Sequence, residues 1–284
     1  MGRAGFRAVE GAVRAYARID RTASLLGSAA RLFADGALGA ALAADEKMRL
    51  TVGLYDLSAR QYRPGAGLWQ WEERWFACRL PPPPARILIG AAGAGREAVA
   101  LAERGYQVAA FEPAMVMHAQ ATTAARGRFP VVRAAYEDVA GAAAGRGETG
   151  HGLAALVGAR WDAVLFGWTS LSHLLEPDVR ARVLAACSRL APRGPLLVSF
   201  VARLGAPSAP RSRIWRLARR LGAAAARARG LDPARDADGA QFDRAIGFVR
   251  PFTPAELDGM AAAIGRTAIH EVEAGFPHAT LVPS

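Results

Sequence analysis

The chain has 284 residues, of which 52% are hydrophobic and 21% are charged. This composition can bury a full core and excludes a disordered chain. The two cysteines, Cys78 and Cys187, are far apart, which excludes a disulfide framework and a cysteine-rich metal site, so we expect no metal. No apolar run approaches the roughly 20 residues of a membrane span, and the N-terminus lacks a secretory signal. We expect a cytoplasmic protein that does not bind membranes.

The net charge of +11 raises the question of nucleic-acid binding. Lys47 is the only lysine, so nearly all of this charge comes from arginine. No basic strand interleaved with aromatic residues and no zinc-ligand spacing accompanies it, and we therefore expect no nucleic-acid partner. The arginine cluster at 211–229 fits a solvated helix face, with contact to an anion as the alternative.

Residues 1 to about 48 carry apolar side chains at helical spacing, with a break suggested by Gly36 and Gly39. We expect a packing appendage here; a cap over the active site or the interface of a homodimer are the alternatives. Pro81 to Pro84 form a stiff spacer that neither a helix nor a central strand can include. The boundary is placed there, with a helical appendage or cap at 1–80 and a core domain at 81–284.

Aromatic residues are concentrated between these two parts. A helix over 48–62 would place Tyr55, Ala59 and Tyr62 on one face. Trp71 and Trp75 are four residues apart and are expected to pack in the core. Trp69 follows a Pro/Gly-rich turn and is expected to face a pocket.

The sequence pattern of residues 86–115 predicts a strand–turn–helix–strand unit, and the acidic residue Glu112 follows its second strand. Strands are expected at Arg86–Ile89 and Gln107–Phe111, and a helix at Arg96–Arg104. The glycine turn at 90–95 lets a ligand approach the backbone, and the helix start offers free N–H groups. Glu112, 17 residues past Gly95, stands where it can accept hydrogen bonds from a ribose.

This run resembles the first motif of class I (Rossmann-like) S-adenosylmethionine (SAM) methyltransferases, hydrophobic-hydrophobic-acid-hydrophobic-G-x-G-x-G. The resemblance implies SAM as cofactor and S-adenosylhomocysteine (SAH) as product. Ile89 departs from it, because the family has an acid there that holds the methionine amino group. Ala91 departs as well, at the position of the first glycine.

The glycine spacing leaves other readings open. Gly93, Gly95 and Ala98 also match the G-x-G-x-x-G/A dinucleotide fingerprint, so an NAD(P)-binding oxidoreductase is one alternative. A Tyr-x-x-x-Lys catalytic pair is excluded, because Lys47 precedes the core. The departures at Ile89 and Ala91 keep a catalytically inactive, methyltransferase-like binding protein as a second alternative.

The rest of the chain supplies the remaining parts of the fold. We expect a helix from Pro113 to about Arg126, strands at 131–135, 161–168 and 194–201, and a helix at 177–190. A Gly-rich linker is expected at 141–152 and a helical, Arg-rich insertion at about 204–251. Thr253, Pro254 and Glu256 form a capping box that opens a helix. Two final strands, at 267–273 and 278–282, complete a doubly wound α/β fold with a mostly parallel seven-stranded sheet and a C-terminal antiparallel hairpin.

The resemblance implies a direct methyl transfer to a small molecule, with oxygen or nitrogen as acceptor atom. His173, at the carboxyl end of the fourth strand, is the candidate catalytic base. Trp69, Trp168 and Ser170 are the candidate substrate-binding residues. The candidate cofactor-binding residues are Tyr62, Gly90, Ala91, Gly93, Gly95, Glu112, Pro113, Glu137, Asp138, Phe166 and Gly167.

Overall fold

The computed structural model describes residues 27–30, 33, 35–62, 67–146, 150–203, 213–232, 239–243, 245–273 and 275–284. The chain divides into two compact units, residues 1–43 with 208–237 and residues 44–207 with 238–284. The expectations for residues 1–26 and for Arg211 therefore lie outside the described part. Among the described helices, none has both the length and the apolar character that crossing a membrane requires.

The smaller unit contains a helical segment at 35–41 and helix α9 (Arg213–Ala228). The two helices approach closely, because a Cβ on Gly222 would lie 2.3 Å from the carbonyl oxygen of Ala37. Ala218 and Ala226 are buried on the same face of α9. The described arginines of the cluster are mostly exposed, as expected for a solvated helix face.

The larger unit is built on a seven-stranded sheet in the order β3-β2-β1-β4-β5-β9-β8. The first five strands in this order are parallel, and β9 pairs antiparallel with both β5 and β8. This confirms the expected fold class. The strands are β1 (Arg86–Gly90), β2 (Gln107–Phe111), β3 (Val131–Val132), β4 (Ala163–Phe166), β5 (Leu196–Ser199), β8 (Arg266–Glu273) and β9 (Phe276–Pro283).

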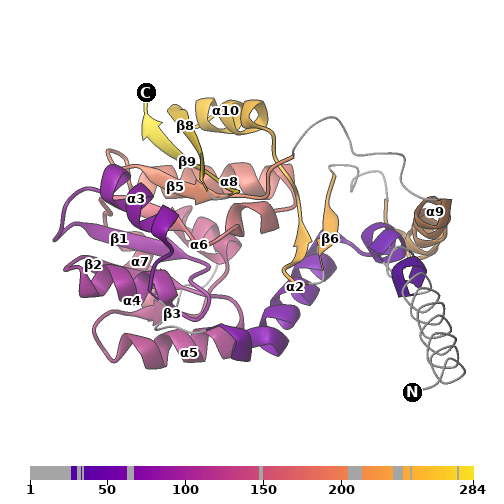
Figure 1. Ribbon diagram of the computed structural model, residues 1–284, viewed down its shortest axis with the longest axis horizontal. Helices are drawn as coiled ribbons and strands as arrows, with labels where there is room; N and C mark the ends of the chain where they lie inside the picture. Colours follow the sequence, from indigo (N-terminus) through magenta and orange to yellow (C-terminus); the bar gives the residue numbers. More distant parts are fainter. Residues whose placement is uncertain are drawn as a thin grey trace, which may run out of the picture. The chain divides into compact units, whose positions relative to one another are not determined.

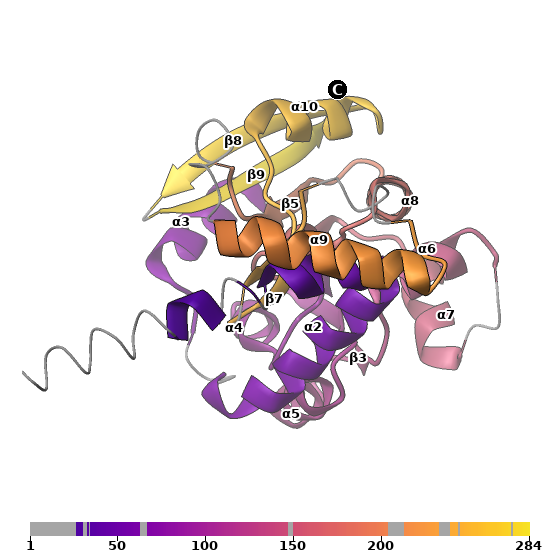
Figure 2. The ribbon, with the colours of Figure 1, turned by 90° about the vertical axis from the view of Figure 1, so that its right-hand side faces the viewer.

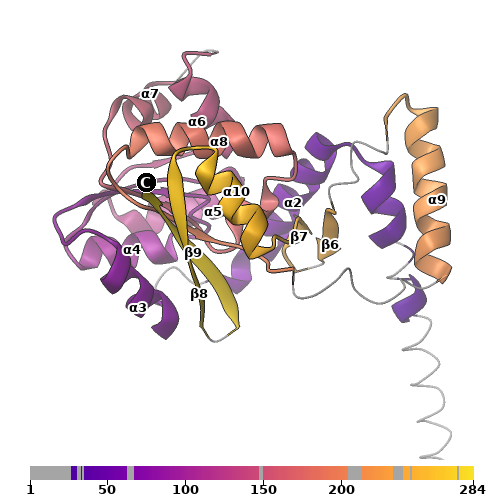
Figure 3. The ribbon, with the colours of Figure 1, turned by 90° about the horizontal axis from the view of Figure 1, so that it is seen from above.

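Helices cover both faces of this sheet, so its central strands are apolar throughout. Ile87 and Ile89 of β1 pack with the helices of one face, whereas Leu88 packs with those of the other. Figure 3 shows α3 and α4 on one side of the sheet and α6, α7 and α8 on the other. The helices are α3 (Gln70–Arg79), α4 (Arg96–Glu103), α5 (Met115–Ala125), α6 (Tyr136–Ala143), α7 (His151–Gly158), α8 (Pro177–Leu190) and α10 (Pro254–Ala262).

The predicted capping box at the start of α10 is confirmed. The Thr253 hydroxyl accepts from the Glu256 N–H at 3.2 Å, and the Glu256 carboxylate accepts from the Thr253 N–H at 2.8 Å. The helix lies beside the β8–β9 hairpin (Figure 2). Arg266 ties this hairpin to the turn between α8 and β5, because its guanidinium donates to the carbonyls of Ala191 and Gly194, each at 2.6 Å.

Several predicted boundaries were wrong. The third strand has two residues instead of five, and α6 and α7 occupy both ends of the predicted linker at 141–152. The helix expected from Pro113 begins at Met115, because the side chain of Glu112 accepts the Ala114 N–H. The insertion is not wholly helical: β6 (Gln241–Asp243) and β7 (Gly247–Val249) form an antiparallel pair within it.

Helix α2 (Ala44–Ser58) and the 3₁₀ turn η1 (Ala59–Gln61) belong to the same unit as the sheet. Helix α2 runs beside the β6–β7 pair (Figure 1) and packs on β7. The contact is close, because the Thr51 hydroxyl accepts from the Phe248 N–H at 2.9 Å. Gly247, at φ +82°, allows this approach, since a Cβ there would lie 2.6 Å from the Thr51 hydroxyl oxygen. Residues 44–80 thus pack with the core domain, and the proposed division at residue 81 stays a prediction.

Candidate functional site

A cavity of about 860 Å³ lies at the carboxyl ends of β1, β2 and β4 and is lined by the residues that follow these strands. In parallel α/β sheets this edge is where ligands bind. Within the described residues no cluster of His, Cys, Asp and Glu is arranged to hold a metal ion. Ten of the sequence-predicted site residues line the cavity: Tyr62, Trp69, Ala91, Gly93, Glu112, Pro113, Glu137, Trp168, Ser170 and His173.

The glycine turn after β1 forms the floor of the cavity. Gly93 has φ +56° and would have no atom within 4 Å of an added Cβ, so its backbone is open to a ligand. Ala91 adopts φ +49°, a conformation that glycine tolerates better than alanine.

Five predicted cofactor residues do not line the cavity: Gly90, Gly95, Asp138, Phe166 and Gly167. A Cβ on Gly90 would lie 2.5 Å from the Phe111 ring, and one on Gly167 would lie 2.2 Å from the carbonyl oxygen of Ala91. Gly95, at φ +90°, is the N-cap of α4. These glycines shape the turn by close packing and left-handed backbone, while Phe166 stacks on the ring of Tyr136 with centroids 4.9 Å apart.

Glu112 is held rigidly at the tip of β2. One carboxylate oxygen accepts from the Gly93 N–H at 2.8 Å and the other from the Ala114 N–H at 2.9 Å. The residue is only 5% exposed, and burial raises the pKa of its carboxyl to about 7. Each oxygen keeps a further lone pair, so the carboxylate can accept two hydroxyl donors from a ligand.

The two acids at the start of α6, Glu137 and Asp138, were both predicted to bind the cofactor, but only Glu137 faces the cavity. Asp138 is exposed, and its carboxylate accepts from the Ala135 N–H at 2.8 Å, which caps its own helix. Beside them, the Tyr136 hydroxyl is hydrogen-bonded to the Ser170 hydroxyl at 2.8 Å, which fixes Ser170 in the cavity wall.

Tryptophans form one end of the cavity. Trp69 and Trp168 meet edge to face with ring centroids 5.2 Å apart, and both line the cavity as the sequence predicted. Trp71 and Trp75 are buried, with their rings stacked 5.9 Å apart, in agreement with the predicted core role. The Trp75 indole N–H donates to the Thr280 hydroxyl at 2.9 Å, which links α3 to β9.

His173 is buried and has a hydrogen-bond partner at each ring nitrogen. Its Nδ1 lies 2.9 Å from the carbonyl oxygen of Phe248, and its Nε2 lies 3.0 Å from the Tyr55 hydroxyl. A carbonyl only accepts, so Nδ1 carries the proton, and Nε2 accepts from Tyr55. Burial lowers the pKa of His173 and raises that of Tyr55, so the neutral pair is the stable state.

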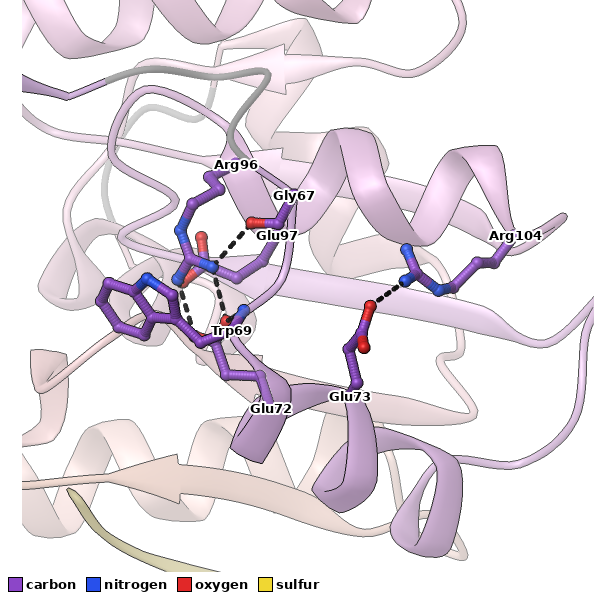
Figure 4. A network of polar contacts seen from close by, with 7 residues as sticks. All are labelled: Gly67, Trp69, Glu72, Glu73, Arg96, Glu97 and Arg104. Atoms are coloured by element: carbon purple, nitrogen blue, oxygen red, sulfur yellow. Dashed lines mark hydrogen bonds and ion pairs between the residues drawn. The ribbon is translucent and has the colours of Figure 1, made fainter. Parts of the chain in front are cut away.

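Sequence reasoning did not find this Tyr55–His173 pair, although Tyr55 belongs to the Tyr55–Tyr62 string that it singled out. It also missed Arg96, which stands beside Glu72, Glu97 and Trp69 (Figure 4). Arg96 and Glu97 are adjacent, but Glu72 lies 24 residues before Arg96, and no spacing rule joins it to them. A third missed group is the apolar wall formed by α2 and the start of α8: Met48, Val52, Leu174, Leu175 and Val179.

Comparison with known proteins supports the fold. No protein-family model matches the sequence, and no curated protein sequence matches it significantly. A structure of DhpI in complex with SAM and HEP shares 19% identity and superposes with a TM-score of 0.52 over 83% of this chain and 96% of DhpI. The CcbJ methyltransferase from Streptomyces caelestis shares 16% identity and gives a TM-score of 0.50 over 88% of this chain and 100% of its own.

The chain has the class I methyltransferase fold. A complex of DhpI with SAH gives a similar result, with 18% identity and a TM-score of 0.51 over 84% of this chain and 97% of DhpI. At such identities the likeness defines the methyltransferase fold alone, so function must be argued from the site.

Proposed function

We propose that this protein is a SAM-dependent methyltransferase that acts on a small molecule, with oxygen or nitrogen as the acceptor atom. The observation that carries the proposal is the Glu112 carboxylate, which backbone N–H groups of the glycine turn and of residue 114 hold at the cavity, 2.8 and 2.9 Å away. In this fold, an acid there is suited to both hydroxyls of a ribose. The cavity of about 860 Å³ is within the size range of small-molecule sites.

The residues around Glu112 fit the other parts of SAM. Glu137 lies at the cavity wall beyond β3, where it would accept from the adenine amino group. Gly93 leaves the backbone open for the nucleoside. Tyr62 lies against Tyr55, with ring centroids 6.1 Å apart, and would cover the methionine part.

The acceptor would occupy the remainder of the cavity, between α2 and the start of α8. Met48, Val52, Leu175 and Val179 make this part apolar, and the walls of Trp69 and Trp168 add aromatic surface. We propose an acceptor with an apolar or aromatic body. A nucleic acid or a protein tail fits a largely apolar cavity poorly. A cytoplasmic location and a homodimer through the N-terminal helices complete the proposal, and light scattering on the purified protein tests the dimer.

SAM, when bound, supplies an electrophilic methyl group on its sulfonium. The protein's part is to align the acceptor and to exclude water. Tyr55 and His173 offer a route for a proton: the Tyr55 oxygen takes the acceptor's proton while its own proton passes to Nε2 of His173, 3.0 Å away. In this arrangement His173 acts through Tyr55, and the Phe248 carbonyl stabilises the imidazolium that forms.

The cofactor assignment is tested by thermal unfolding with SAM, SAH, NADH, NADPH or no ligand. A ligand that binds only the folded state raises the melting temperature. We expect SAM and SAH to raise it and the nicotinamides to leave it unchanged. A rise with NADH or NADPH alone would identify a dinucleotide site, and no rise with any ligand would support a binding protein without this cofactor.

The proton route is tested once a screen of phenols and amines identifies a substrate. Tyr55→Phe should lower kcat about 10²- to 10⁴-fold with little change in SAH affinity. Tyr106→Phe, on a tyrosine outside the cavity, is the matched control. If Tyr55→Phe keeps full turnover between pH 6 and 9, the route is wrong.

A further inference from the structure

Arg96 joins two buried carboxylates beside the cavity (Figure 4). Its two terminal nitrogens donate to the two oxygens of Glu72, at 2.5 and 2.6 Å, and one of them also donates to Glu97 at 2.9 Å. Glu72 is 2% exposed and Glu97 is 6% exposed. One guanidinium is therefore shared between two buried carboxyl groups and cannot pair fully with both.

Glu97 is the less completely paired of these two carboxyl groups. Glu72 binds Arg96 through both oxygens and also accepts from the Trp69 N–H at 2.8 Å, so it is well satisfied. Glu97 has a single bond to Arg96 and backbone N–H contacts that include Trp168. It lines the cavity, whereas Glu72 does not. Burial of an incompletely paired carboxylate is costly, which is why it raises the pKa of Glu97.

A positively charged ligand group would remove this cost. Such a group would bind beside Glu97, which lies in the first turn of α4, directly after the glycine turn and next to the end of β4. The tip of β1 offers no alternative carboxylate, because Ile89 is fully buried in the core there. The indole ring of Trp168 borders the same part of the cavity and also favours a cation, whereas the Trp69 ring already has the Arg96 guanidinium 4.2 Å from its centroid.

We propose that Glu97 binds an ammonium group of a ligand in this cavity. This rests on the proposed function, which supplies two sources of such a group: the aminoacyl end of SAM or an amine acceptor. The location beside the glycine turn favours the aminoacyl end. Glu97 would then replace the acid that is missing at position 89.

The test compares two nucleosides by isothermal titration at pH 7.5. SAH carries the ammonium, whereas 5′-methylthioadenosine has the same nucleoside and thioether without the amino-acid end. Wild type should bind both, and Glu97→Gln should weaken SAH binding at least tenfold while it changes 5′-methylthioadenosine binding less than twofold. Glu103→Gln, on an exposed residue of the same helix, is the matched control and should bind both as wild type does.

A second arm covers the acceptor as the source. With SAH saturating, benzylammonium and its neutral analogue benzyl alcohol are tested for their effect on the melting temperature. Protection by benzylammonium alone, lost in Glu97→Gln, with SAH affinity unchanged, would place the ammonium on the acceptor. Equal weakening of both nucleosides in Glu97→Gln, or no effect in either arm, would overturn the inference. Failure of wild type to bind either nucleoside would instead refute the proposed function.

Discussion

Nucleoside binding should depend on pH through Glu112. Burial raises the pKa of this carboxyl to about 7, although two backbone N–H groups donate to it. A ribose needs the ionised form, because each hydroxyl then donates to a carboxylate oxygen. A protonated carboxyl loses one of these acceptors. The affinity should therefore be highest above pH 7 and fall as the pH is lowered through this value.

The size of the effect follows from the fraction of Glu112 that is ionised. With a pKa of about 7, roughly nine-tenths of the carboxyl is ionised at pH 8 and roughly one-tenth at pH 6, so Kd should rise about tenfold between them. Glu112→Gln cannot ionise. It should bind about 10- to 100-fold more weakly at pH 8, from the loss of charged hydrogen bonds worth about 1.5–3 kcal/mol, and should lose the tenfold dependence on pH that Glu112 produces.

The assay is titration with 5′-methylthioadenosine at pH 6, 7 and 8. This ligand lacks the amino-acid end, so its binding is insensitive to protonation at Glu97. Burial lowers the pKa of His173, which moves its protonation toward the acid side of this range. A constant Kd for wild type, or a tenfold change that persists in Glu112→Gln, would refute the assignment of the ribose to Glu112.

Further predictions concern packing and capping. Gly167→Ala should abolish SAH binding and lower the melting temperature, because the added Cβ would lie 2.2 Å from the Ala91 carbonyl oxygen. The matched control is Gly259→Ala in α10, where an added Cβ would have no atom within 4 Å. This control should stabilise the protein by about 0.5–1 kcal/mol. Unchanged SAH affinity in Gly167→Ala would show that the turn can move. Thr253→Ala removes the cap that accepts from Glu256 and should cost about 1 kcal/mol, or about 2–4 °C, in thermal unfolding with normal SAH affinity; an unchanged melting temperature would mean that the cap is not stabilising.

The parts that sequence reasoning predicted well depend on local patterns. The strand at Gln107–Phe111 and the helix at Pro177–Leu190 have the predicted bounds. In each case apolar periodicity and a terminal signal, such as glycine or proline, act within a few residues. The same reasoning placed Glu112 at the cavity, because parallel strands bring their carboxyl ends to one edge of the sheet.

The parts that it missed depend on contacts between distant segments. The β6–β7 pair lies in a region whose arginines and alanines favour a helix, and β7 packs on α2, which is far away in the sequence. The partner of His173 is 118 residues away, at Tyr55. Arg96 and Glu72, 24 residues apart, likewise meet only in the folded chain.

The hydrogen bond between Thr51 and Phe248 has a consequence for the order of biosynthesis. It joins residues 197 positions apart, and Phe248 also holds His173 through its carbonyl. The β1–α4–β2 unit with Glu112 can form soon after it leaves the ribosome, since its contacts are local. Helix α2 also packs on α5, but its contact with β7 must wait until residue 248 has been synthesised. A growing chain would thus complete the support of His173, which Phe248 provides, only after most of the chain has left the ribosome.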